Sequence, residues 1–197
     1  MFLMFGIGVT YGITPLVAQA DGKKDFTKIS RLLRHGIILS LVIGVVLVFF
    51  LFGLSEAFPY MSQPEEVVAL GKPYFLIIAS SLLPLLLFQG FRQFAEGMSV
   101  TKPIMYITII ANLINVVLNY FLIYGKFGFP ELGLNGAGWA TLVSRILMAI
   151  ALFIFVKNYN KFKEFRSGFD LTAVKADFFR PMLKIGLPTG IQFVFEV

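Results

Sequence analysis

The sequence has no cysteine and few charged residues. Without cysteine in its 197 residues, the chain can form no disulfide, no CxxC redox centre and no thiolate metal site. Charged residues make up 14% of the chain, whereas an ordinary soluble domain carries roughly 25%. Hydrophobic residues make up 57%. This balance indicates an integral membrane protein rather than a soluble one.

The sequence also lacks the residues that intramembrane catalysis requires. Histidine occurs once, at His35, and no aspartate lies within an uncharged apolar run. Proteolysis inside a membrane would need a Ser/His pair, paired aspartates or an HExxH motif within such runs. A lone histidine is also a poor metal site. The sequence therefore predicts a protein that is not an enzyme and has no cofactor.

Five apolar runs are long enough to cross a bilayer, and a sixth begins near the end of the chain. About twenty helical residues cover a hydrocarbon core of roughly 30 Å. The predicted fold class is an all-α integral membrane protein, with a bundle of five complete transmembrane helices plus part of a sixth. The runs cover residues 1–20, 36–55, 73–91, 103–125, 136–156 and 185–197.

Positive charge is concentrated in alternate connectors. Connectors 21–35, 92–102 and 157–184 carry 5, 2 and 7 Lys or Arg residues, whereas the other two carry only Lys72 and Lys126. The positive-inside bias predicts that the three basic connectors are cytoplasmic and that the chain lies in the plasma membrane, with the lipid bilayer as a partner. Because topology accounts for the net charge of +6, no nucleic-acid partner is expected.

The connector 21–35 has a pattern of its own. Phe26, Ile29, Leu32 and Leu33 recur at helical spacing opposite the basic residues. This pattern predicts a short amphipathic helix at the membrane surface. A solvated loop that only sets the topology is the alternative.

Few polar side chains interrupt the apolar runs, and these are the candidate site residues. Asn112, Asn115 and Asn119 are spaced by three and four residues and so share a helix face. They are expected either to bond a neighbouring helix or to line an aqueous cavity. Arg145 lies near the middle of the run 136–156, where lipid exposure would be costly. It is expected to face a cleft.

The last run carries Gln192, a further candidate for lining a cleft, and Glu196. A carboxylate eleven residues into a membrane segment is a functional candidate by default. In a low-dielectric cleft it can be neutralised by a proton or by a desolvated Na⁺. Glu196 is therefore the predicted site of the coupling cation, and a metal ligand if that cation is Na⁺. The alternative is a glutamate satisfied by an interhelical hydrogen bond, with no transport role.

Prolines and glycines within the runs are predicted to bend helices or to permit close packing. Proline removes a backbone donor, and a GxxxG spacing lets a second helix approach. The residues predicted to do this are Pro15, Pro84, Gly186, Pro188 and Gly190, and Gly8 and Gly12 form a second GxxxG pair.

Four separated stretches resemble the multidrug and toxic compound extrusion (MATE) family, in its NorM-like branch. They are FGIGVTYGITPLVAQADG at 5–22, FRQFAEGMSVTKP at 91–103, NYFLIYGKFGFPELGLNGAGWAT at 119–141 and GLPTGIQFVFE at 186–196. The resemblance implies twelve helices in two six-helix lobes. Residues 1–182 would supply the second to sixth helices and a cytoplasmic connector, and 183–197 the truncated first helix of the second lobe.

The resemblance also implies a function. Members exchange Na⁺ or H⁺ for small organic cations, and NorM-like members use a glutamate on the seventh helix, the position that Glu196 matches. The implied function is secondary active multidrug efflux, for which the remaining helices of a full-length transporter are required partners. A flippase for lipid-linked saccharides, of the same wider fold, and a non-transport structural membrane protein are the alternatives.

Overall fold

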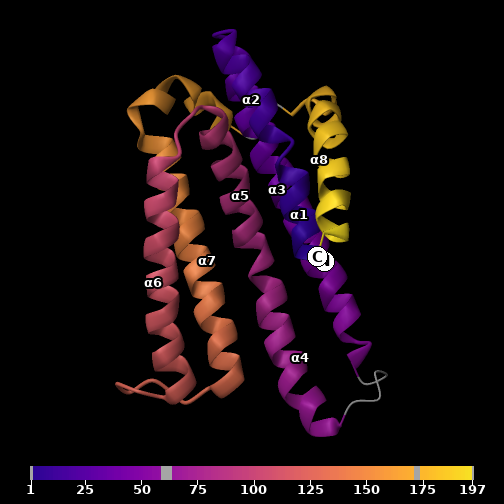
Figure 1. The fold of residues 1–197 in the computed structure, drawn as a ribbon, viewed down its shortest axis with the longest axis vertical. Helices are drawn as coiled ribbons and strands as arrows, with labels where there is room; N and C mark the ends of the chain where they lie inside the picture. The colour runs from indigo at the N-terminus through magenta and orange to yellow at the C-terminus, as the bar shows by residue number, and fades with distance from the viewer. Residues whose placement is uncertain (1, 59–63, 171–173, 197) are drawn as a thin grey trace.

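The computed structural model describes residues 2–58, 64–170 and 174–196, and every regular element in them is a helix (Figure 1). Five helical segments are long and apolar enough to cross a membrane. They cover Phe2–Gly22, Phe26–Ser55, Glu65–Gly97, Lys102–Tyr124 and Gly133–Asn158. The predicted five-helix membrane bundle is thus confirmed.

The first crossing consists of two helices, α1 (Phe2–Thr10) and α2 (Ile13–Gly22). The chain turns at Tyr11 and Gly12 between them. Pro15, in the first turn of α2, has no N–H to donate to the carbonyl of Tyr11. The sequence therefore interrupts the backbone hydrogen bonds near the middle of this crossing.

The second crossing, α3 (Phe26–Ser55), is one continuous helix of 30 residues. The Asp25 carboxylate caps its start by accepting a 2.9 Å hydrogen bond from the backbone N–H of Lys28. The prediction of a separate surface helix or loop at 21–35 is therefore wrong from residue 26 onward. The reason is packing: Ile29, Leu32 and Leu33 are buried in the core rather than facing lipid headgroups.

The third crossing consists of α4 (Glu65–Ser80) and α5 (Leu82–Gly97), with a turn at Ser81. Pro84 cannot donate to the carbonyl of Ser80, which weakens the helix at this point. The connector expected at 92–102 is shorter than predicted, because α5 continues to Gly97 and leaves only four residues before the next helix.

The fourth and fifth crossings, α6 (Lys102–Tyr124) and α7 (Gly133–Asn158), lie side by side (Figure 1). α6 ends at Gly125, whose φ of 61° is a left-handed conformation that glycine adopts at little cost. Only Ile104 and Ala111 of α6 are buried. Its exposed apolar side chains are suited to contact with lipid.

The basic connector after α7 is more structured than the sequence suggested. It forms the 3-10 helices η2 (Asn160–Phe169) and η3 (Ala176–Phe178), and α8 (Phe179–Phe195) follows. Phe162 and Phe165 of η2 are buried, with ring centroids 5.4 and 6.3 Å from that of Phe94. Their spacing of three residues matches the three residues per turn of a 3-10 helix, so both rings point into the core.

The core lies toward one end of the bundle. The buried side chains come mainly from α2, the first half of α3, the second halves of α5 and α7, and η2. In Figure 1 this is the upper end, where the connections before α3, before α6 and around η2 also lie. The three basic connectors therefore share one end of the molecule, as the predicted alternation requires.

Candidate functional site

Arg145 projects from α7 toward the break between α4 and α5. Its Nη1 donates to Oγ of Ser81 at 2.5 Å, and that hydroxyl donates to the carbonyl of Ile78 at 2.6 Å. The guanidinium is half-buried. The turn at Ser81 thus provides the hydrogen-bond partner that holds this arginine inside the protein.

Arg145 borders a cavity of about 330 Å³ between α5, α6 and α7. Asn112 and Asn115 of α6 line the same cavity, so three of the predicted site residues meet there. Asn119 is not among the lining residues; its Nδ2 donates to Oδ1 of Asn115 at 3.0 Å. The cavity wall is completed by Leu85, Phe88, Gln89, Arg92, Thr108, Ala111, Thr141, Ser144 and Met148.

The sequence prediction missed the contribution of α5 to this cavity. Gln89 and Arg92, three residues apart, share a helix face and reach it from that helix. The sequence predicts Arg92 in a connector, whereas α5 extends five residues past it. Its Nε donates to Oε1 of Glu96 at 2.7 Å. A spacing of three between two polar residues at the end of an apolar run was the available signal.

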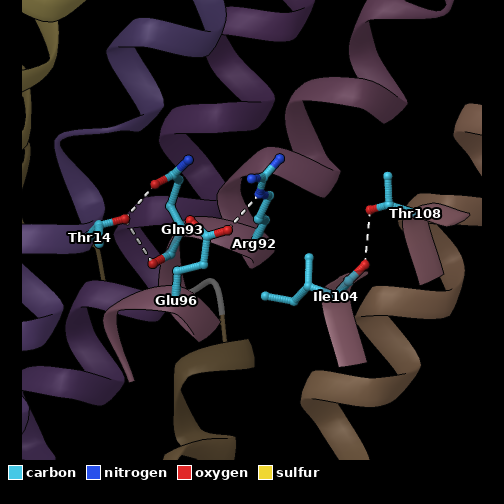
Figure 2. A network of polar contacts seen from close by, with 6 residues as sticks. All are labelled: Thr14, Arg92, Gln93, Glu96, Ile104 and Thr108. Carbon is cyan, nitrogen blue, oxygen red and sulfur yellow. Dashed lines mark hydrogen bonds and ion pairs between the residues drawn. The ribbon is translucent and has the colours of Figure 1, made fainter. Parts of the chain in front are cut away.

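α5 is fixed on its other side by α2. The hydroxyl of Thr14 contacts both the backbone oxygen and Oε1 of Gln93, as Figure 2 shows beside the Arg92–Glu96 pair. Gln93 is completely buried. This contact sets the rotation of α5 about its axis and so directs Gln89 and Arg92 toward the cavity.

Glu196 lies apart from this cavity, at the end of α8. Its Oε1 accepts a 2.7 Å hydrogen bond from Nε2 of Gln192, one turn earlier, and both side chains are exposed. Neither residue lines the cavity beside Arg145. The structure therefore brings the two residues predicted on α8 together, but separately from those on α6 and α7.

α1 and α8 approach each other through glycines. A Cβ atom on Gly8 would lie 2.5 Å from Cα of Gly190. A Cβ atom on Gly12 would collide with the carbonyl oxygen of Met182, and one on Gly186 with that of Val9. The two GxxxG pairs thus face each other across one crossing, while α8 continues through Pro188 without a break.

His35 joins α3 to the segment before α8. Its Nε2 accepts a 3.0 Å hydrogen bond from the backbone N–H of Lys175, and its Nδ1 lies 2.7 Å from the carbonyl oxygen of Arg31. The ring also stacks on Phe178. The single histidine is therefore satisfied by backbone groups and an aromatic neighbour.

The MatE family model matches residues 1–121 of the chain. The chain belongs to the MATE family. It is 34% identical over 191 residues to the probable multidrug resistance protein NorM of Oceanobacillus iheyensis, which covers 96% of this chain and 42% of the relative. It is 32% identical over 203 residues to the multidrug resistance protein NorM of Photobacterium profundum, covering 99% and 43%.

Solved MATE structures confirm the fold. A multidrug resistance MATE family transporter of the MOP superfamily, in an inward-facing conformation, matches 98% of this chain and 43% of its own, with a TM-score of 0.83 and 19% identity. A MOP superfamily transporter from Pyrococcus furiosus matches 98% and 42%, also with a TM-score of 0.83. The chain spans less than half the length of the curated relatives it matches. With its five spans and bacterial relatives, it is placed in the plasma membrane.

The described residues offer few acidic side chains that could form a cation site. Within residues 2–58, 64–170 and 174–196, no three His, Cys, Asp or Glu side chains are close enough to hold a metal ion. Of the described acids, Glu196 is the one that the sequence predicts for the cation site. Na⁺ prefers several oxygen ligands, so the others would have to come from amides, carbonyls or other helices.

Proposed function

We propose that this MATE chain forms part of a secondary transporter that exports cationic, drug-like compounds in exchange for Na⁺ or H⁺. The observation that carries the proposal is the match of nearly the whole chain, at 30–34% identity, to relatives named as multidrug resistance proteins. The region of similarity extends from the first crossing to α8 and so includes every element described above.

Within this proposal, Glu196 binds the coupling cation. A carboxylate in a membrane cleft changes occupant readily, because either a proton or a Na⁺ ion removes the cost of its unpaired charge. Gln192 supports the assignment, since its amide holds Oε1 at 2.7 Å and leaves the second carboxylate oxygen for the cation. The drug would occupy a cleft lined in part by this end of α8.

The α1–α8 crossing is the proposed contact between the lobes. If α8 is the first helix of the second lobe, its glycine contact with α1 joins the two halves of the transporter. Close backbone packing of this kind depends on small residues and leaves no room for side chains to intervene. Movement of one lobe against the other would then pivot near Gly8 and Gly190.

The proposal can be tested in a chimera in which this chain replaces the aligned segment of the Photobacterium profundum relative. In drug-hypersensitive bacterial cells, the chimera is expected to expel ethidium. Glu196→Gln keeps the size of the side chain but cannot be charged, and it is expected to lower the efflux rate at least tenfold. Glu131→Gln is the matched control, because Glu131 is an exposed loop residue.

Equal efflux by the chimera with Glu196→Gln and with Glu131→Gln would remove Glu196 from the mechanism. Chimera that is present in the membrane but expels no ethidium, while the intact relative does, would contradict the multidrug function of this chain.

The flippase alternative is favoured by one feature, the arginines in the cavity between α5, α6 and α7. A lipid-linked saccharide carries phosphate, which guanidinium groups bind well. Ethidium efflux driven by an ion gradient would exclude this alternative as the main activity, because a flippase has no use for a soluble cationic dye.

A further inference from the structure

The loop between α6 and α7 holds a phenylalanine in an unfavourable backbone conformation. The backbone N–H of Phe129 donates a 3.2 Å hydrogen bond to the carbonyl of Lys126, which closes a four-residue turn. The two central residues, Phe127 and Gly128, have φ angles of 58° and 86°. Turns with two positive φ angles favour asparagine or aspartate followed by glycine, because larger side chains are strained there. Gly128 fits this rule, and Phe127 breaks it.

The side chain of Phe127 also gains little from the rest of the protein. Phe127 is 85% exposed. In the described part of the chain its ring contacts one other ring, that of Phe121, with the centroids 5.3 Å apart. A residue that is both strained and exposed breaks two local rules without compensation inside the chain, and such positions are typically functional. Phe127 therefore indicates a contact outside this chain.

Phe127 belongs to a cluster of five aromatic residues at the end of α6, the loop aromatic cluster: Tyr120, Phe121, Tyr124, Phe127 and Phe129. The rings of Phe121 and Phe129 are stacked, with centroids 5.7 Å apart and planes 10° apart. The ring of Tyr120 lies 5.7 Å from that of Tyr124 and 6.0 Å from that of Phe121. Tyrosine has an apolar ring and a polar hydroxyl, so it suits the boundary between lipid and water.

The loop aromatic cluster continues the exposed apolar face of α6. Leu113, Val116, Val117, Tyr120 and Tyr124 recur at intervals of three or four residues or one turn, and each is at least half exposed. In Figure 1 the loop extends outward past α6 at the lower end of the bundle, away from the other helices. The loop thus reaches over the lipid that contacts this face of α6.

We propose that the α6–α7 loop inserts the ring of Phe127 into the interfacial region of the bilayer, in the leaflet opposite the three basic connectors. Transfer of the ring out of water offsets the strain of its backbone. The exposed Lys126 can extend its ammonium group to the lipid headgroups. Such an anchor fixes the depth and tilt of α6 and α7 in the membrane. The inference does not depend on which compound is transported.

The test measures the depth of a tryptophan in the turn. The full 197-residue chain is reconstituted in phosphatidylcholine vesicles, with Trp139→Phe removing its single tryptophan. Phe127→Trp in this background is expected to be quenched at least twofold more strongly by lipid spin-labelled near the headgroup than by lipid labelled near the end of the acyl chain. Val116→Trp, at a residue of α6 that is 66% exposed, is the control and is expected to show the reverse order.

Quenching of Phe127→Trp by iodide in the water and by neither lipid would overturn the proposal and leave the loop as a surface for a soluble partner. Stronger quenching from the end of the acyl chain would also overturn it, because the loop would then lie below the interface.

A second pair of variants covers the case in which Phe127→Trp does not fold. Phe129→Trp, in the same background, reports on the loop from a position without a positive φ. Adding Phe127→Asn creates the asparagine and glycine pair that this turn favours, but removes the ring. We expect this addition to lower the quenching of Phe129→Trp by the headgroup label at least twofold. Unchanged quenching would show that Phe127 does not hold the loop in the bilayer.

Discussion

Gly186 and Gly190 set how closely α8 approaches α1. Gly186→Ala would drive a Cβ atom into the carbonyl oxygen of Val9, a backbone atom that cannot rotate away. Overpacking of this kind costs about 1–3 kcal/mol. We expect Gly186→Ala to lower the melting temperature of the chain by several degrees, measured by circular dichroism in detergent.

Gly53→Ala is the control for this substitution. Gly53 also lies inside a helix, α3, but a Cβ atom there meets nothing within 4 Å. Alanine is the better helix former by about 1 kcal/mol, so this variant should melt at the same or a higher temperature. Equal melting of both variants would show that the α1–α8 contact is loose.

At the scale of single residues, the candidate polar side chains could be recognised because such residues are rare in the apolar runs. Arg145 and the asparagines of α6 stand out because so few charged or amide groups interrupt the apolar runs. Ser144 did not stand out, because an unpartnered serine differs from an ordinary helix serine only in a hydrogen bond that it lacks. Whether the Ser144 hydroxyl finds a partner depends on how α7 packs, and the spacing of residues in the sequence does not reveal it.

At the scale of elements, substitutions in η2 test how much this connector stabilises the core. Phe162 is 1% exposed and its ring packs edge-on against that of Phe94. Truncating a buried phenylalanine costs about 3–5 kcal/mol. Phe162→Ala is therefore expected to destabilise the chain strongly. Phe49→Ala, at a residue of α3 that is 71% exposed, is expected to change the melting temperature little.

Equal melting of Phe162→Ala and Phe49→Ala would mean that η2 is a surface loop with no role in the core.

The sequence predicted helices better than connectors. Hydropathy and length fixed the five crossings, because each must satisfy its backbone inside the bilayer. The connector 157–184 was described by its charge, and 21–35 as a surface helix or a loop. In the structure, aromatic and aliphatic residues of both segments pack into the core. Phe26–Ser55 is one helix because half of its first three turns is buried, and that burial depends on contacts with α5 and η2, which lie far away in the sequence.

For the whole molecule, the absence of cysteine makes topology directly measurable. Lys126→Cys and Lys163→Cys each introduce a single thiol at an exposed position, the first between α6 and α7 and the second in η2. These two segments lie at opposite ends of the bundle (Figure 1). In intact bacterial cells we expect a membrane-impermeant maleimide to label Lys126→Cys. Lys163→Cys should react only after the cells are permeabilised. The reverse pattern would contradict the positive-inside assignment.

We propose that Glu196 couples ion flow to export. The most direct measurement follows ethidium transport by the chimera in proteoliposomes with an imposed Na⁺ or H⁺ gradient. We expect one of the two gradients to drive transport, an ionophore that dissipates it to stop transport, and Glu196→Gln to be inactive under both gradients. Transport that continues without a gradient, or that Glu196→Gln sustains at the original rate, would contradict the account.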